Sequence, residues 1–185
     1  MKRSSLTALL VTFGLAGCAS NAPLTYLVLS PVPGQVYSAA GPEIAVGRVA
    51  MPPAIDRSFL TTGTGENTVM ISYNAKWAAP LETLAQATLA KDLSTRLPNH
   101  MVLMPGDHVP ANTTIVSVNV SSFLPDATQV CLEADWRAFN PATQQAQTGR
   151  TTIYVPTSSN ATAQAQAMSQ ALGQLADHIA AQVSP

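Results

Sequence analysis

The sequence predicts an α+β fold in which an antiparallel β-sheet carries two main helices packed on one face. Apolar and polar residues alternate along 113–123 and 128–139, which is typical of strands with one buried face. Apolar residues recur at helical spacing along 81–97 and 161–183. Strands come first, then a helix, a β-meander and a second helix, and this order favours helices gathered on one face of the sheet.

The first half of the chain supplies strands and a hairpin. Residues 43–51 are predicted as a strand that ends at Pro52 and Pro53, because proline cannot donate to a strand ladder. Two further strands, 58–62 and 68–73, flank a glycine-rich turn and form a hairpin.

The first helix follows Pro80 and ends at Pro98. Its charged residues are expected on the side that faces solvent; they are Glu82, Lys91, Asp92 and Arg96. A short strand is expected at 100–104.

The second half reads as a meander and a closing helix. Residues 148–155 supply a third strand after the predicted pair, and Asn160 with its two preceding serines offers N-cap oxygens for the last helix. Small residues on that helix, Ala161, Ala165 and Ala176, favour close packing against the sheet.

The N-terminus reads as an export signal. Lys2 and Arg3 precede an apolar run from Leu6 to Leu15, and small residues lead to Cys18. The run is shorter than the roughly 20 apolar residues that span a bilayer. The tetrapeptide Leu-Ala-Gly-Cys resembles the lipobox of bacterial lipoproteins, which implies that residues 1–17 are a lipoprotein signal peptide and that Cys18 is the lipid attachment site. An ordinary secretory signal with a chance cysteine is the alternative.

The remaining chain divides into two parts. Residues 18–42 are rich in Ala, Pro, Gly and Ser, and are predicted to form a mobile lipidated tether interrupted by a short strand at 24–29. Residues 43–185 are predicted to form the folded α+β domain. Ala19 follows Cys18; by resemblance to enterobacterial lipoproteins, the absence of Asp there favours the periplasmic face of the outer membrane.

Charge excludes several classes of partner. Removal of residues 1–17 takes away Lys2 and Arg3 and changes the formal net charge from −1 to −3. No run of Lys and Arg occurs, so we expect no nucleic-acid binding and no basic membrane-surface patch. The polar, weakly charged composition permits homo-oligomers. Cys131 is the one cysteine left after Cys18, so no intramolecular disulfide is expected.

No catalytic constellation is visible. The sequence contains no nucleophile elbow, phosphate-binding loop or His-Glu-x-x-His motif. His100, Asp107 and His108 are interpreted as loop residues, and Glu133 with Asp135 as a solvated or ion-paired strand face that Arg137 continues. We therefore predict that the protein is not an enzyme and needs no metal or cofactor.

Three segments together resemble a known family. They are Tyr26-Leu27-Val28-Leu29, the stretch from Val46 to Arg57 with its Val-Gly-Arg-Val and Ile-Asp-Arg elements, and Trp77-Ala78-Ala79-Pro80-Leu81. With the lipobox, they are similar to the ABC-type transport auxiliary lipoproteins of the PqiC (YmbA) type. The family usually has Tyr-Leu-Asp-Arg where this chain has Ala54-Ile55-Asp56-Arg57.

The resemblance implies a noncatalytic subunit of an intermembrane lipid transport system that supports membrane integrity. Its partners would be an MCE-type periplasmic protein and its ABC transporter. The candidate interface is the proline-bounded segment, with Pro52, Pro53, Ile55, Asp56, Arg57 and Phe59 presented to the partner. The alternative is that Asp56 and Arg57 pin this loop to its own domain, and that Trp77 and Leu81 are core residues.

Two other functions stay open. A stand-alone periplasmic lipoprotein that binds lipid or another small ligand would need a cavity between helix and sheet. An envelope hydrolase would need a nucleophile and a base, which the sequence does not assemble.

Overall fold

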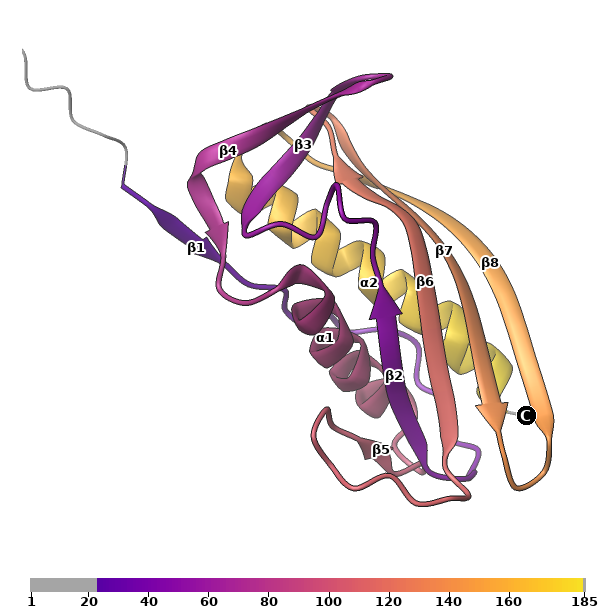
Figure 1. Ribbon diagram of the computed structural model, residues 1–185. Coiled ribbons are helices and arrows are strands. Elements are labelled where there is room, and N and C mark those ends of the chain that lie inside the picture. The colour runs from indigo at the N-terminus through magenta and orange to yellow at the C-terminus, as the bar shows by residue number, and fades with distance from the viewer. Residues whose placement is uncertain (1–22, 185) are drawn as a thin grey trace, which may run out of the picture.

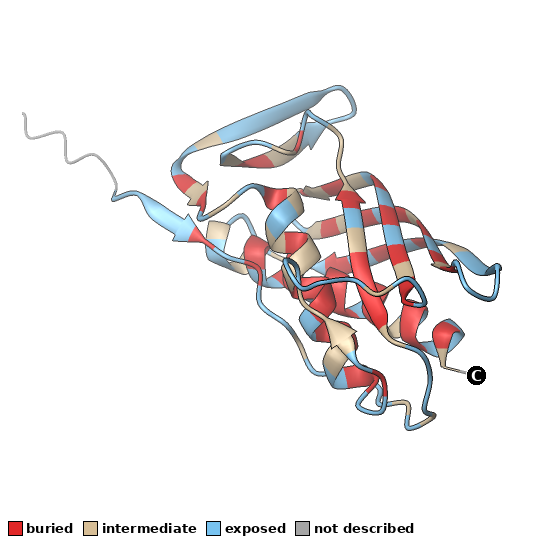
Figure 2. Cartoon of the chain, turned by 60° about the horizontal axis from the view of Figure 1, so that its bottom comes forward, coloured by how far each residue is buried: buried red, intermediate tan, exposed pale blue. Residues whose placement is uncertain are grey.

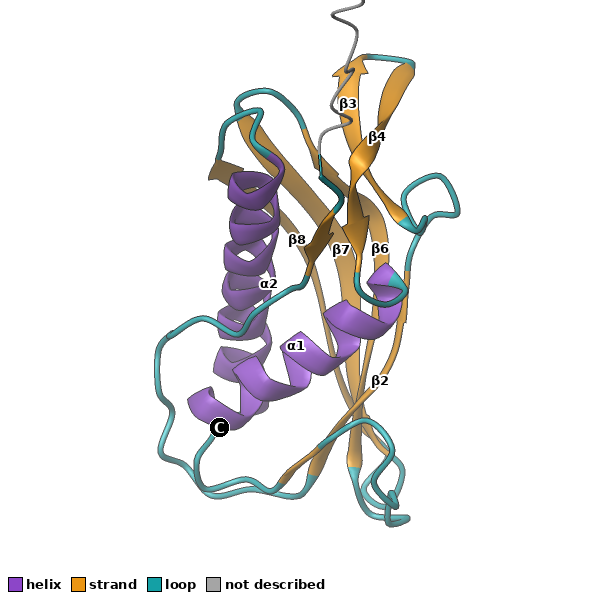
Figure 3. Ribbon diagram, turned by 90° about the vertical axis from the view of Figure 1, so that its left-hand side faces the viewer, coloured by secondary structure: helices purple, strands orange, loops and turns teal. Residues whose placement is uncertain are grey.

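The computed structural model describes residues 23–184, and the predicted signal peptide and Cys18 lie outside them. Two helices lie side by side on one face of a five-stranded sheet, and a smaller three-stranded sheet extends from one end (Figures 1 and 3). The predicted α+β class and the placement of both helices on one face are confirmed.

The large sheet has the strand order β5-β2-β6-β7-β8. Its strands are β2 (Ile44–Ala50), β5 (Val102–Leu103), β6 (Thr114–Pro125), β7 (Gln129–Asn140) and β8 (Gln145–Pro156). The last three form the predicted antiparallel meander. Buried and exposed residues alternate along these strands (Figure 2).

The prediction of a purely antiparallel sheet is wrong. β2 pairs parallel with both β5 and β6, in register Ala45 to Leu103 and Ala45 to Ile115. The chain between β2 and β6 contains a hairpin and a whole helix, and such a long crossover lets two strands run in the same direction. Alternation along single strands carries no information about the direction of their neighbours.

The small sheet has the order β1-β4-β3. β3 (Phe59–Gly65) and β4 (Thr68–Trp77) form the predicted hairpin, and β1 (Thr25–Leu27) adds to β4 in parallel. β4 is longer than the predicted 68–73. Its inner end supplies Ala75 and Trp77 to the core, where both are buried.

The helices are α1 (Leu81–Arg96) and α2 (Ala161–Val183). The Asn160 side chain caps α2 by accepting hydrogen bonds from the amides of Thr162 and Ala163, at 2.9 and 3.1 Å. Ala165 and Ala176 are buried, in agreement with the predicted close packing of α2 on the sheet.

Residues 24–42 are not the mobile tether that composition predicted. They run as an extended strap along α1 and α2, with Leu27 and Leu29 buried in the core. The amide of Ser30 donates to Ser169 Oγ at 3.1 Å, and the amide of Tyr37 donates to the carbonyl of Arg96 at 2.7 Å. The content of prolines and glycines predicted a flexible segment. In the structure these residues allow an extended chain to follow the surface of the helices closely.

Two charged residues expected on the solvent side of α1 are buried beneath this strap. Asp92 and Arg96 are 0 and 1% exposed and form an ion pair with each other, while Asp177 of α2 pairs with Arg96 from the other side. The prediction failed because the helical pattern was judged without the strap, which covers that face of α1.

Candidate functional site

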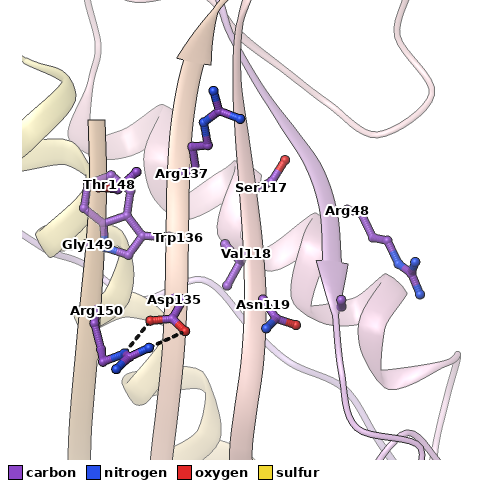
Figure 4. Close-up of a pocket in the computed structure, with 11 residues that line it drawn as sticks. Arg48, Ser117, Val118, Asn119, Asp135, Trp136, Arg137, Thr148, Gly149 and Arg150 are labelled. Atoms are coloured by element: carbon purple, nitrogen blue, oxygen red, sulfur yellow. Dashed lines mark hydrogen bonds and ion pairs between the residues drawn. The ribbon is translucent and has the colours of Figure 1, made fainter. Parts of the chain in front are cut away.

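A groove of about 700 Å³ crosses the outer face of the large sheet, opposite the helices (Figure 4). The register of β6, β7 and β8 places two rows of outward-facing side chains along the groove. Ser117, Arg137 and Thr148 are direct neighbours across β6, β7 and β8, and Asn119, Asp135 and Arg150 form the next row. Arg48 and Ala50 close the groove on the β2 side.

The exposure of Arg48 depends on an irregularity in β2. The register between β2 and β6 shifts between Val46 and Val49, so that Gly47 and Arg48 occupy a bulge. Val46 and Val49 are both buried, whereas Arg48 is exposed. A bulge at this position re-aims one side chain toward the outer face.

Between the two rows lies the groove floor. It is formed by Val118, Trp136 and Gly149, which are direct neighbours across β6, β7 and β8. Val118 and Trp136 are buried. A Cβ atom at Gly149 would lie 2.7 Å from three atoms of the Trp136 indole. Glycine is therefore required here for the indole to lie flat against β8.

The charges of the groove are mainly positive. Three of the seven Lys and Arg residues that follow Cys18 line it, against Asp135 as its single acid. Asp135 is held by Arg150 through two hydrogen bonds of 2.6 and 3.1 Å, and this contact lowers the pKa of the carboxyl group. The Arg137 guanidinium lies over the Phe139 ring, 4.5 Å from its centroid.

Arg48 and Arg137 thus supply the positive charge of the groove that Asp135 does not offset. A guanidinium presents paired N–H donors to a carboxylate or a phosphate. Ser117 and Asn119 lie between the two arginines and offer neutral hydrogen-bonding groups. The groove is suited to an extended segment or ligand with an anionic group.

The predicted interface segment continues directly from this groove. β2 ends at Ala50 and the loop 51–58 follows. Pro53 and Arg57 are exposed, and Pro52, Asp56 and Phe59 are half-buried. Ile55 is only 4% exposed and belongs to the core, so its predicted role as a presented side chain is wrong. The loop folds back on itself, with the Ile55 amide donating to the Pro52 carbonyl at 3.0 Å, and this turns Ile55 inward.

The charged pair of the loop has contacts within its own domain. Arg57 Nε donates to the Ala54 carbonyl at 3.1 Å, and Asp56 Oδ1 accepts from the amide of Glu82 at 3.4 Å. Asp56 thereby ties the loop to the first turn of α1. Trp77 and Leu81 are 3 and 1% exposed, which confirms the alternative that they are core residues.

The residues considered for metal or nucleophilic chemistry are dispersed. His100 Nδ1 lies 3.0 Å from the Pro42 carbonyl, whereas Asp107 accepts from the amide of Met104. Within residues 23–184 no group of three or more His, Cys, Asp or Glu side chains could hold a metal ion. Cys131 is half-buried, and burial together with nearby Glu133 raises the pKa of its thiol.

Sequence reasoning did not find the groove. Arg48, Arg137 and Arg150 lie on three different strands and come together only through strand register. The available signal was the outward-facing position of Arg137 on β7, next to Asp135.

The model of the ABC-type transport auxiliary lipoprotein component family matches residues 26–180. The chain belongs to this family. The match covers the strap, both sheets and nearly all of α2. No curated protein matches the chain.

Two solved structures are similar to this auxiliary lipoprotein. A crystal structure of an uncharacterized protein superposes with a TM-score of 0.73 at 18% identity, covering 88% of this chain and 100% of the other. A Xanthomonas campestris protein of the DUF330 family superposes with a TM-score of 0.68 at 15% identity, covering 88% and 95%. At these identities the likeness shows the shared fold.

In the described part of the chain, neither helix combines the length and apolarity that crossing a bilayer requires.

Proposed function

We propose that this auxiliary lipoprotein is a noncatalytic adaptor, anchored through Cys18 to the periplasmic face of the outer membrane. It would present its groove and the adjoining loop to an MCE-type protein of an ABC lipid transport system. The observation that carries the proposal is the family match over residues 26–180, combined with an arginine-lined surface and no assembled catalytic group among the residues described.

The packed strap would affect how closely an anchor at Cys18 holds the folded domain to the membrane. An acyl chain on Cys18 would be followed by only six residues before β1, and from β1 onward the chain is packed on the domain. The strap is then held to α1 and α2 by hydrogen bonds to Asp92, Arg96 and Asp177. Such an anchor would restrict the distance between the folded body and the membrane.

The partner surface would combine the groove with the exposed part of loop 51–58. Arg48 and Arg137 would pair with carboxylates of the partner, and Arg57 adds a further exposed cation at the β2 end. Pro52 and Pro53 restrict the backbone of the loop, which lowers the entropy lost on binding.

The anchor is tested by growing cells with an alkyne-bearing palmitate analogue and recovering the full-length protein. We expect label on the wild-type protein, none on Cys18→Ser, and a shift of that variant from the outer-membrane to the soluble fraction. Label on Cys18→Ser would refute the attachment site, and sedimentation of wild type with inner membranes would refute the location.

The partner surface is tested by co-purification from cells that carry a transporter of this type. The double variant Arg48→Glu and Arg137→Glu should recover at least tenfold less MCE-type protein than wild type. Lys91→Glu is the matched control, because Lys91 is an exposed cation on α1, away from the groove. Equal recovery with the groove variant would reject this surface.

A further inference from the structure

The exposed large apolar side chains are concentrated on the small sheet. Seven of the eleven in the described chain lie on β4 or on β1 and its flanking residues. β4 contributes Val69, Met70, Ile71 and Tyr73, and Tyr73 is 94% exposed. The outer part of β4, residues 68–74, is mostly exposed, whereas Leu60 and Thr61 of β3 are buried (Figure 2).

This part of the molecule also lacks charge. Glu66, in the hairpin turn, is the single charged residue between 58 and 75, and none occurs between 18 and 42. Val69 and Ile71 alternate with Met70, so these apolar side chains occupy both faces of the hairpin. A cluster of exposed apolar side chains marks a site of contact with another body, and the lack of charge removes the cost of taking ionised groups out of water.

The geometry relates this surface to the proposed anchor. β1 runs parallel to β4, with Thr25 opposite Ala75. Both strands point into the body of the molecule (Figure 1). The chain that precedes Thr25 therefore leaves β1 on the same side as the β4 residues directly before Ala75, and β4 then bends away toward the hairpin turn, which lies at the same upper end of the molecule (Figure 1).

The lengths are compatible. Seven residue steps separate Cys18 from Thr25 and span at most about 25 Å. Six steps along β4, from Ala75 to Val69, span at most about 20 Å, and less because β4 bends between them. The acylated thiol and the apolar end of the hairpin are able to reach one plane at the same time.

We propose that the β3–β4 hairpin is a second membrane contact, which docks Val69, Met70, Ile71 and Tyr73 onto the bilayer that holds the acyl chains of Cys18. This inference rests on the acylation proposed above. The bilayer is the favoured occupant because the anchor keeps it within reach of the hairpin at high effective concentration. Tyrosine and apolar side chains without charge suit the membrane interface.

Two contacts would orient the domain, where a single lipid anchor would leave it free to rotate. The groove lies on the large sheet, which shares one hydrophobic core with the base of the hairpin through Leu60, Ala75 and Trp77. Docking the hairpin would therefore fix the direction in which Arg48 and Arg137 face.

The test uses the full-length acylated protein in vesicles of phosphatidylethanolamine and phosphatidylglycerol. A spin label is placed at Met70→Cys in a Cys131→Ser background, with Thr152→Cys on the exposed side of β8 as the matched control. The reference for each is the same labelled protein carrying Cys18→Ser, without vesicles. Collision with a water-soluble nickel complex should fall at least fivefold at position 70 on vesicle binding and change less than twofold at position 152.

Flotation of the vesicles separates the two proposals. Protein that fails to float refutes acylation, and the hairpin contact falls with it. Protein that floats with position 70 still open to the nickel complex refutes the hairpin contact alone. Protection at position 70 that rises with protein concentration in the absence of vesicles would identify a second copy as the occupant and also overturn the proposal.

Discussion

Arg96 of α1 and Asp177 of α2 form an ion pair with Nε and Oδ1 2.6 Å apart, and the N-terminal strap is bonded to both residues. Arg96 donates to the Val32 carbonyl of the strap and to the Gly173 carbonyl of α2, at 3.0 and 2.9 Å. The Gln35 amide donates to Asp177 at 3.0 Å. One guanidinium thus joins both helices and the segment that leads to Cys18.

Replacement of Arg96 by Ala should destabilise the protein by about 3–5 kcal/mol, because it leaves the buried Asp92 carboxylate without its charge partner. Urea unfolding at pH 7 measures the change. Arg96→Lys should recover part of the loss, since a lysine keeps the charge and loses the fork of donors.

Lys91→Ala on the exposed side of α1 is the control for this prediction and should shift the unfolding free energy by less than about 0.5 kcal/mol. An Arg96→Ala protein as stable as the control would show that the cluster is not a structural joint.

Acidification should stabilise the protein through Asp92. Burial raises the pKa of this carboxyl from 3.8 to about 6, against the hydrogen bond from the Val32 amide and the charge of Arg96. Its Oδ2 atom is buried without a hydrogen-bond partner. Because the folded state binds this proton more tightly than the unfolded chain, the stability contribution is present below pH 4 and is lost as pH rises through 6.

The full size of this effect follows from the pKa difference and amounts to about 3 kcal/mol, most of which is lost between pH 4 and 7. Asp92→Asn removes the titrating group and retains an oxygen that accepts from Val32. The difference in unfolding free energy between the two proteins should therefore change with pH in this range. Parallel pH profiles for wild type and Asp92→Asn would contradict the assignment.

Gly173→Ala should release the strap. A Cβ atom at Gly173 would overlap the Val32 side chain. Alanine otherwise favours a helix over glycine by about 1 kcal/mol, so destabilisation here would be opposite to helix propensity. Chymotrypsin should cleave after Tyr37, which is half-buried in the strap, at least tenfold faster in the variant.

Gln174→Ala, at the neighbouring exposed position of α2, is the control and should leave the cleavage rate unchanged. Equal cleavage of the two variants would mean that the strap contact tolerates a methyl group at position 173.

The sequence predicted the elements of this fold far better than their pairing. Alternation located β6 and β7, and helical spacing located α1 and α2, because each pattern is local. Parallel pairing of β2 with β6 depends on a crossover of some sixty residues, which no local pattern encodes. The same limit hid the groove, since its arginines become neighbours only through register.

The predictions of a mobile tether and of solvent-exposed Asp92 and Arg96 failed for a linked reason. A proline-rich segment and a charged helix face each look solvent-exposed when they are judged alone. The Val32 amide donates to Asp92 Oδ1 at 2.8 Å, and this contact, together with the Arg96 ion pair, offsets part of the cost of burying the carboxylate. Of the predicted interface, the exposed Pro53 and Arg57 remain candidates, whereas Ile55 belongs to the core.

Gly149→Ala should destabilise the large sheet and disturb the groove floor. The added methyl carbon would lie 2.7 Å from the Trp136 indole, which is buried and would have to shift to accommodate it. Glycine weakens a strand by about 0.5–1 kcal/mol relative to alanine, so an unobstructed site would gain stability from this change. Overpacking costs about 1–3 kcal/mol, and we expect a net loss of about 1–2 kcal/mol in urea unfolding, with a shift in Trp136 fluorescence read in a Trp77→Phe background. Gly63→Ala is the control, because its nearest neighbour, the Pro125 carbonyl oxygen, is 3.7 Å from the added atom. Equal gains in stability for both alanine variants would contradict this prediction. They would mean that the Trp136 indole moves aside freely and that the groove floor is not a rigid surface.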